Sequence, residues 1–459
     1  MSLEWKSCKI GDLGKIFSGG TPSTKIKEYW DGDLNWLSSG ETRNTYIYTT
    51  DKFITEEGAN NSSTKLANKG DIVIASAGQG FTRGQSSMVM IDTYVNQSVI
   101  VISPNDKVNN HYLLYNLKFR YPELRQLSDH ASTRGSLTTK IIKGLDINLP
   151  DLNTQNKIAT IIQYFDKKIE TNKRINKNLF NIIDFIFKDY VGDYEDLEIV
   201  SLSENTQEII RGFNSKYVEK SNIKNFNQKV NKGTFLEKQH FKYLDENIEI
   251  PKAKFAKKRD VLVNSLGDGT VGRPHYYNED TDNVVVDQHI TIIRANEDLI
   301  PSTYIYEYLK NSTGQYHLDS LISGSTGMLM LNISEIRNLK IPILDKKNLR
   351  EFDTTVTPLF DKITKNFEEI YCLSKLRDTL LPKLMSGEIN VSEVNCDLKI
   401  IIRKIYIKSS KLFLWRYLSE NQNHIKNTKS NETLLKSRAI HKINKFLAKF
   451  NARYRYYRQ

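Results

Sequence analysis

Two stretches of the sequence carry residue types that could do chemistry. Residues 267–272 read GDGTVG and match the G-x-G-x-x-G pattern of dinucleotide-binding loops. Asp151, followed by Asp166-Lys167-Lys168, imitates the acidic-lysine signature of many nucleases, whose carboxylates converge on a metal ion. Each chemistry needs a particular element: a helix must open at a dinucleotide loop, and adjoining strands must carry the nuclease carboxylates.

The surrounding sequence does not supply those elements. Arg273 and Pro274 follow the glycine-rich loop and lead into His-Tyr-Tyr, which predicts a strand where a helix is required. Asp166 falls inside a helical apolar pattern. The eight histidines show no paired ligand spacing, and the sequence has no Asn/Asp-Pro-Pro-aromatic motif of the amino-methyltransferase kind. We therefore expect no catalysis by this chain alone, and no cofactor or metal ion.

The distribution of charge limits what composition can say about partners. The chain has 459 residues, enough for about three domains, and a formal net charge of +12. Residues 394–459 hold 16 Lys and Arg against three acidic residues, whereas the preceding 393 residues hold 50 basic and 51 acidic groups. DNA binding by the main body must therefore depend on local patches. Three scattered cysteines and the lack of a secretory signal or an apolar run of spanning length predict a cytoplasmic protein.

The chain also repeats itself. Four pairs of segments match in constant order: KGDIVIA at 69–75 with KRDVLVN at 258–264, VNQSVIVI at 95–102 with VDQHITII at 286–293, GLDINLP at 144–150 with NLKIPIL at 338–344, and FDKKI at 165–169 with FDKI at 360–363. Their offset grows only from 189 to 195 residues. This predicts two half-chains of roughly 190 residues with diverged interiors.

Each half begins with short β-branched runs and ends in a helical pattern. Apolar residues recur with a period near 3.5, from Ile158 to Ile186 in the first half and from Phe352 to Leu384 in the second. Two long helices that pair along a stripe are therefore expected. Polar Asn172 and Asn176 interrupt the first stripe, as residues that fix the register of a helix pair can do. Pro358 is expected to start or kink the second helix.

Together with these repeats, two longer segments resemble specificity subunits of type I restriction-modification systems. They are EWKSCKIGDLGKIFSGGTPSTKIKEYWDGDLNWLSS near the start and LRDTLLPKLMSGEINV after the second helical pattern. The resemblance covers residues 1 to about 393. It implies an α+β fold in which two pseudo-repeated α/β target-recognition domains are joined by two long antiparallel conserved helices. The domains would be 1–150 and 196–344, and the spacer helices 151–195 and 345–393.

The same resemblance implies a non-catalytic subunit that reads a bipartite target in double-stranded DNA. Each half would read one part of the target. The helices would set the spacing and dock modification (methyltransferase) subunits, and restriction (endonuclease/translocase) subunits would join the complex. No membrane is implied. A coiled-coil adaptor that binds only protein partners remains the alternative.

The resemblance also identifies residues for DNA contact. The hydroxyls and lysines of the opening turn, Thr21, Ser23, Lys25 and Lys27, suit phosphates, whereas the aromatics beside them, Tyr29, Trp30 and Trp36, suit a framework. Loop candidates for base contact are Asn61, Ser62, Ser63, Thr64, Lys65, Gln79, Arg83, Gln85, Ser132, Thr133 and Arg134 in the first half. In the second half they are Arg211, Asn214, Lys216, Asn264, Ser265, Arg273, His275, Ser325 and Thr326. A solvated-loop role stays open for each of them.

Two features fall outside that set. Asn96-Gln97 and Asp287-Gln288 recur in both halves, which favours a framework or phosphate role over base reading. The basic C-terminal extension, 394–459, departs from the family pattern. Its interleaved aromatics could track a nucleic-acid backbone, or the segment could be an extension with little structure.

Overall fold

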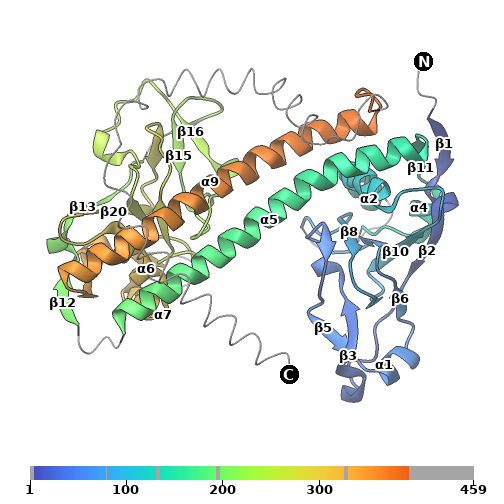
Figure 1. Ribbon diagram of the computed structural model, residues 1–459, viewed down its shortest axis with the longest axis horizontal. Helices are drawn as coiled ribbons and strands as arrows, with labels where there is room; N and C mark the ends of the chain where they lie inside the picture. The colour runs from blue at the N-terminus through green and yellow to red at the C-terminus, as the bar shows by residue number, and fades with distance from the viewer. Residues whose placement is uncertain are drawn as a thin grey trace. The chain divides into compact units, whose positions relative to one another are not determined.

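The computed structural model describes residues 5–78, 80–130, 135–192, 197–214, 216–324 and 329–391. These residues form two compact units. Unit 1 contains the described residues up to Ile169 and those from Cys372 onward, and unit 2 contains Glu170–Tyr371. Two 40-residue helices, α5 (Leu152–Val191) and α9 (Lys346–Met385), each contribute one part to unit 1 and the other part to unit 2 (Figure 1).

Unit 1 contains a five-stranded sheet in the order β2-β10-β7-β8-β4, a four-stranded sheet in the order β5-β3-β9-β6, and the pair β1-β11. Its strands are β1 (Lys6–Lys9), β2 (Gly14–Ser18), β3 (Trp30–Leu37), β4 (Tyr46–Ile47), β5 (Lys52–Ile54), β6 (Lys65–Ala67), β7 (Ile72–Ala75), β8 (Ser86–Val89), β9 (Thr93–Val95), β10 (Val99–Pro104) and β11 (Asp146–Leu149). Its shorter helices are α1 (Glu56–Asn60), α2 (Asn110–Phe119), α3 (Tyr121–His130) and α4 (Thr139–Gly144).

Unit 2 contains two four-stranded sheets, in the orders β13-β20-β17-β18 and β14-β16-β15-β19, and the pairs β12-β23 and β21-β22. Its strands are β12 (Glu198–Ser201), β13 (Thr206–Arg211), β14 (Tyr217–Val218), β15 (Lys224–Phe226), β16 (Lys242–Leu244), β17 (Asp260–Asn264), β18 (Pro274–Tyr277), β19 (Val284–Val286), β20 (Ile290–Ala295), β21 (Ile322–Ser323), β22 (Met330–Leu331) and β23 (Lys340–Ile343). Its shorter helices are α6 (Ser302–Lys310), α7 (Ser312–Ser320) and α8 (Ile333–Asn338).

The main sheets of the two units repeat one another. The order β2-β10-β7-β8 in unit 1 matches β13-β20-β17-β18 in unit 2, and every neighbouring pair in both is antiparallel. The repeated segments KGDIVIA and KRDVLVN supply the central strands β7 and β17. The predicted fold class, two pseudo-repeated mixed domains with two long helices, is confirmed.

Both faces of each main sheet are buried, which explains the continuous apolar runs of the central strands. In β7, Ile72 and Ile74 pack in a core with Tyr112 of α2 and with α5, while Val73 packs in a second core with strands of the other sheet. In β17, Val261 faces helices in the same way, and Leu262 faces the second sheet. Side-chain alternation along a strand therefore gives each unit three layers: helices, main sheet and second sheet.

The nuclease-like carboxylates have structural roles in unit 1. Asp151 caps the N-terminus of α5. Its carboxylate accepts two hydrogen bonds from Thr154, one from the backbone amide at 3.0 Å and one from the side-chain hydroxyl at 2.7 Å. These bonds lower the pKa of Asp151. Asp166 is buried and accepts from Tyr115 Oη at 2.8 Å and from Arg377 Nη1 of α9 at 2.7 Å. The sequence-based rejection of a nuclease site is consistent with these contacts.

Within unit 2, α5 and α9 pair in an antiparallel direction through buried asparagines. Asn172 Nδ2 donates to Glu369 Oε2 at 2.8 Å, and Asn366 Nδ2 donates to Asn176 Oδ1 at 2.7 Å. Asn176 Nδ2 also donates to the carbonyl oxygen of Ile363 at 3.3 Å. A slip of one helix along the other would leave these amides unpaired in a buried seam, so they fix the register.

Pro358 is predicted to start or kink the second helix, and the first of these alternatives is wrong. α9 begins at Lys346, where the carboxylate of Asp345 caps it by accepting from the amide of Asn348 at 2.9 Å, and it continues through Pro358 to Met385. The proline removes one backbone hydrogen bond. Phe352, Val356 and Phe360, on either side of it, are all buried in the unit 2 core, and this packing holds the helix together there.

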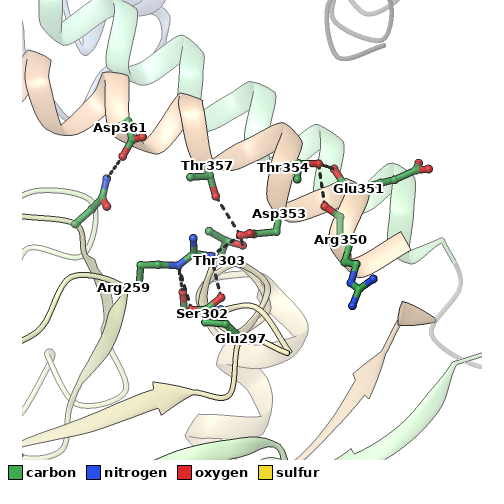
Figure 2. Close-up of polar contacts among 11 residues, drawn as sticks. Arg259, Glu297, Ser302, Thr303, Arg350, Glu351, Asp353, Thr354, Thr357 and Asp361 are labelled. Atoms are coloured by element: carbon green, nitrogen blue, oxygen red, sulfur yellow. Dashed lines mark hydrogen bonds and ion pairs between the residues drawn. The ribbon is translucent and has the colours of Figure 1, made fainter. Parts of the chain in front are cut away.

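A polar network joins α9 to the sheet side of unit 2. Figure 2 shows Arg259, which lies in the turn before β17, between two carboxylates: Glu297, which precedes α6, and Asp353, which belongs to α9. The Arg259 Nη2 atom lies 2.9 Å from Glu297 Oε2 and 2.7 Å from Asp353 Oδ1. The same Asp353 oxygen accepts from Thr303 Oγ1 at 2.7 Å and Thr357 Oγ1 at 3.1 Å. One carboxylate thus connects a turn, α6 and α9.

Candidate nucleic-acid interface

Ser76, a buried serine that follows β7, holds three loop segments of unit 1 together by backbone hydrogen bonds and chain connection. The amide of Ser76 donates to the carbonyl oxygen of Ser98 at 2.8 Å, in the turn before β10. Its own carbonyl oxygen accepts from the amide of Leu137 at 2.9 Å, shortly after residues 131–134. The glycine-rich loop of residues 77–84 leaves directly from this serine. We call this end of the main sheet the loop end.

Unit 2 has the same arrangement around Ser265, after β17. Its amide donates to the carbonyl oxygen of His289 at 2.8 Å, and its carbonyl oxygen accepts from the amide of Leu331 at 2.9 Å. The repeat therefore reproduces the backbone framework that gathers the loops, although the loops themselves differ in sequence.

The opening turn and the segment at 61–65 also meet at the loop end of unit 1. Val95 accepts two hydrogen bonds on its carbonyl oxygen, from the amide of Gly20 at 3.0 Å and from Thr64 Oγ1 at 2.9 Å. Thr21 Oγ1 donates to Gln97 Oε1. Gly19 must be glycine here, because an added Cβ would lie 1.9 Å from the Val95 oxygen. Two groups of predicted contact residues are thereby brought together.

Trp30 and Trp36 of the opening stretch belong to the framework, as expected. Trp36 is buried, and its ring meets that of Trp30 edge to face with centroids 5.0 Å apart. The indole N–H of Trp30 donates to the carbonyl oxygen of Ser23 at 3.1 Å, and that of Trp36 to Gly20 at 3.4 Å. The two tryptophans therefore shape the turn that carries the hydroxyls and lysines.

The two glycine-rich loops are hairpin connections between antiparallel strands, β7 to β8 and β17 to β18. GDGTVG is followed by strand β18, which confirms that no helix opens there to receive a pyrophosphate. Both loops need glycine for their backbone, because Gly80 and Gly269 occupy matching positions with φ of +60° and +67°.

Three predicted arginines, Arg83 and Arg273 in these loops and Arg211 at the end of β13, each donate to backbone carbonyl oxygens. Arg83 Nη1 donates to the carbonyl oxygen of Gly135 at 3.0 Å, and Nη2 contacts Asp129. Arg273 Nη1 and Nη2 donate to the carbonyl oxygens of Asn231 at 3.2 Å and Gly269 at 3.1 Å. Arg211 donates to the carbonyl oxygen of Leu331, and burial lowers its pKa. These guanidinium groups hold the loops in place.

Four predicted contact residues are buried. Thr64 is bonded as described above, and Ser265 Oγ lies 2.7 Å from Thr291 Oγ1. Asn264 Oδ1 accepts from Asn231 Nδ2 at 2.9 Å. His275 Nδ1 lies 2.6 Å from the carbonyl oxygen of Gly233, and burial lowers its pKa to about 4, so this imidazole is neutral at pH 7. Their burial leaves them little surface for a direct contact with DNA, and they support the loops from beneath.

The remaining predicted residues are accessible or lie outside the described part. Exposed ones are Ser23, Lys25, Lys27, Asn61, Ser63, Lys65, Asn214 and Lys216, and half-buried ones are Thr21, Ser62, Arg83, Gln85, Arg211 and Arg273. Gln79, Ser132, Thr133, Arg134, Ser325 and Thr326, together with the extension 394–459, lie outside the described residues. The accessible set contains the hydroxyls, amides and cations that serve phosphates and base edges.

The recurring Asn96 and Asp287 each close a turn, before β10 in unit 1 and before β20 in unit 2. Asn96 Oδ1 accepts from the amide of Ser98 at 2.9 Å, and Asp287 Oδ1 accepts from the amide of His289 at 3.0 Å. This is the local side-chain-to-backbone bond typical of such residues in turns. Asn96 and Asp287 therefore recur in both halves because each stabilises the same turn of the framework.

Beside the second glycine-rich loop lies a hollow of about 340 Å³, lined in part by Lys232, Arg273, Lys310 and Gln315. Its cations already have partners. Lys310 Nζ lies 2.6 Å from Asp184 Oδ1 and 2.8 Å from Glu307 Oε2, and Lys232 lies 3.3 Å from Glu237. The hollow is therefore polar without being strongly cationic.

Sequence reasoning did not select Ser76 or Lys254. Ser76 is the counterpart of the selected Ser265 at the constant offset of the repeat, so the aligned halves contained the signal. Lys254 Nζ donates to the carbonyl oxygen of Arg211 at 2.7 Å, a tertiary contact between residues 43 positions apart that no local pattern marks.

Fold and site together define a recognition protein: a repeated framework displays unlike loops at the end of each main sheet. Across the described ranges, no group of three His, Cys, Asp or Glu side chains could hold a metal ion, and no helix is long and apolar enough to cross a membrane. Residues 2–180 match the family model described as the type I restriction modification DNA specificity domain.

Comparison with known proteins identifies the family. The chain is 30% identical over 427 residues to the type I restriction enzyme MjaIX specificity subunit of Methanocaldococcus jannaschii, covering 85% of this chain and 95% of that protein. It is 23% identical to the HindI specificity subunit of Haemophilus influenzae, over 84% of this chain and 100% of the relative. The chain belongs to the type I restriction enzyme specificity subunits. It is a DNA-recognition subunit and is not itself an enzyme.

The fold agrees with that assignment. The crystal structure of the type I restriction-modification S subunit from M. genitalium superposes with a TM-score of 0.56 at 16% sequence identity. The match covers 83% of this chain and 96% of that one.

Proposed function

We propose that each unit reads one half of a bipartite DNA target through the accessible side chains at its loop end. The observation that carries this is the repeated serine framework, in which Ser76 and Ser265 gather equivalent loops by the same backbone hydrogen bonds. A constant frame with unlike loops suits two readers of different sequences. The target-recognition domains in this proposal are residues 1–150 and 196–344.

The accessible residues divide by chemistry. Ser23, Lys25, Lys27 and Lys65 are exposed hydroxyls and ammonium groups, which suit phosphates and would set the orientation of the duplex. Gln85, Asn214 and the predicted residues that lie outside the described ranges are candidates for base edges, because amide and guanidinium groups form paired hydrogen bonds in the major groove.

The two spacer helices, residues 151–195 and 345–393, would set the distance between the half-sites. The buried asparagines that fix the register of α5 and α9 support this role, since a ruler must not slide. We assign the outer faces of these helices to modification subunits, with restriction subunits joining the assembly. The cytoplasm, where chromosomal DNA lies, is the expected compartment.

The test is a map of methylated adenines in genomes with and without this gene, in cells that contain the cognate modification subunits. A bipartite motif that is methylated only when the gene is present is the expected result. An unchanged methylation pattern together with stable protein complexes would favour a protein-only adaptor.

A domain exchange tests the assignment of one half-site to each unit. Replacing residues 1–150 with the matching part of a relative should change one half of the motif and leave the other half and the gap intact. If both halves changed, the two units would not be independent readers.

A further inference from the structure

The most exposed large apolar side chain in the described part of the protein lies in the glycine-rich loop of unit 1. Phe81 has 84% of its surface exposed, compared with 72% for Tyr316 and 61% for Tyr48, the next in order. Single exposed apolar residues are common on protein surfaces. The position of Phe81 and the support of its backbone are what distinguish it.

The backbone at Phe81 is held by helix α3. Tyr121 Oη donates to the carbonyl oxygen of Phe81 at 2.9 Å, and Arg125 Nη1 donates to that of Gly80 at 2.8 Å. At the base of the loop, the amide of Gly84 donates to the carbonyl oxygen of Ala75 at 2.9 Å. The loop therefore presents an exposed ring from a supported backbone, so little ordering is required when the ring is buried by a partner.

The second unit lacks this ring. In the hairpin of unit 2, Thr270 and Val271 occupy the corresponding tip, and Val271 packs against the core. The frame repeats and the ring does not, which is the pattern expected of a residue that serves the target of one unit only.

The surroundings of Phe81 fit a nucleic acid. The loop starts at Ser76, at the end of the sheet where the opening turn and the segment at 61–65 also lie. Arg125 places a guanidinium group beside it, on the carbonyl oxygen of Gly80. Apolar wedges such as phenylalanine are a known means of unstacking a base step and bending a duplex, and flexible pyrimidine–purine steps yield most easily.

We propose that Phe81 is a specificity-determining wedge that inserts at a base step within the half-site read by unit 1. The proposal rests on the proposed DNA-reading function and adds a residue and a mode of recognition to it. Part of the specificity of unit 1 would then come from the deformability of the DNA rather than from hydrogen bonds to base edges.

The test uses the full chain assembled with its modification subunits, and duplexes that carry 2-aminopurine at successive positions of the mapped target. Fluorescence of 2-aminopurine rises when the base is unstacked. With the wild-type chain, we expect a rise at one step in the unit 1 half-site that is separate from the methylated adenine. Phe81→Ala should abolish that rise and weaken target binding about tenfold or more, while the signal at the methylated adenine remains.

Tyr48→Ala is the matched control. Tyr48 is also an exposed aromatic of unit 1, but it follows β4, which runs parallel to β8 and leads away from the loop end. It should leave both the fluorescence and the affinity unchanged. Phe81→Leu, which keeps an apolar wedge, should retain part of both.

Two results would overturn the wedge. One is target affinity within twofold of wild type with the same fluorescence pattern in Phe81→Ala. The other is loss of co-elution with the modification subunits in that variant, which would make Phe81 a protein-docking residue. If the wild-type complex showed no target-specific binding at all, the proposed function itself would fail and the wedge with it.

Discussion

The turn before the central strand offers a controlled comparison between the two units. Gly70 and Arg259 occupy equivalent positions in the two units. The amide of Gly70 donates to the carbonyl oxygen of Val89 in β8 at 2.8 Å, and the amide of Arg259 donates to that of Tyr277 in β18 at 2.7 Å. Gly70 has φ of +95° and Arg259 has φ of +77°. A residue with a Cβ is strained by about 1–2 kcal/mol in this region, whereas glycine is not. Arg259 therefore carries a backbone strain that its counterpart lacks.

The side chain of Arg259 offsets that strain through Glu297 and Asp353 (Figure 2). The three side chains are 30%, 39% and 21% exposed, so solvent screens the ion pairs, and we assign them together about 1–2 kcal/mol. Arg259→Ala removes the ion pairs and keeps the strain, so it should destabilise unit 2 by roughly that amount. Arg259→Gly removes both and should be about 1 kcal/mol more stable than Arg259→Ala. Gly70→Ala should destabilise unit 1 by about 1–2 kcal/mol.

Native-state hydrogen exchange is the appropriate assay, because it gives separate opening free energies for the amides of β17 and β20 and for those of β7 and β10. Each variant should change exchange in its own unit. If Arg259→Gly were no more stable than Arg259→Ala, or if Gly70→Ala had no effect, the assignment of backbone strain to this turn would be refuted.

Three further outcomes are expected. Asn176→Leu should destabilise the helix pair of unit 2 by about 1–3 kcal/mol, because Asn366 Nδ2 loses its acceptor in a buried seam. The double variant Asn176→Leu/Asn366→Leu leaves neither amide of this hydrogen bond unpaired, so it should recover much of that loss in thermal unfolding. Burial lowers the pKa of His275 from 6.5 in the unfolded chain to about 4 in the folded protein. The contribution of the neutral imidazole to the free energy of unfolding is therefore fully present above pH 6.5, and it is lost by up to about 1.4 kcal/mol per pH unit as the pH falls toward 4. His275→Asn should flatten that part of the plot of stability against pH, and an unchanged plot would contradict the assignment. A chain cut after Glu393 should keep its target sequence but bind DNA with a salt dependence whose slope falls by about 0.9 for each phosphate contact removed; equal slopes for both lengths would mean that the basic extension touches no DNA.

The sequence predicted the architecture well because its signals are periodic and repeated. The apolar stripes from Ile158 and Phe352 identified both long helices, and the matched segments identified β7, β10, β17 and β20. Pro358 does not start the second helix, because a local backbone preference was outweighed by the burial of Phe352, Val356 and Phe360.

The candidate interface was harder to predict, because residue type does not reveal exposure. Asn264, Ser265 and His275 have the side chains of base readers, yet each is buried beneath the loops. Phe81 has the side chain of a core residue and lies almost entirely in solvent. Which polar residues support a loop and which face outward depends on contacts between distant segments, such as that of Lys254 with Arg211.

The division of α5 and α9 between the units has a consequence for synthesis on the ribosome. The core of unit 1 includes Leu380, Leu384 and Met385 in addition to residues between Ile10 and Phe165. Unit 2 is contiguous from Glu170 to Tyr371, so it can close before those last side chains have emerged. At about 5–20 residues per second, the roughly 200 residues between the two parts of unit 1 take about 10–40 seconds to translate. During that interval the nascent first domain exposes an apolar face, and completing it requires the far end of the same chain.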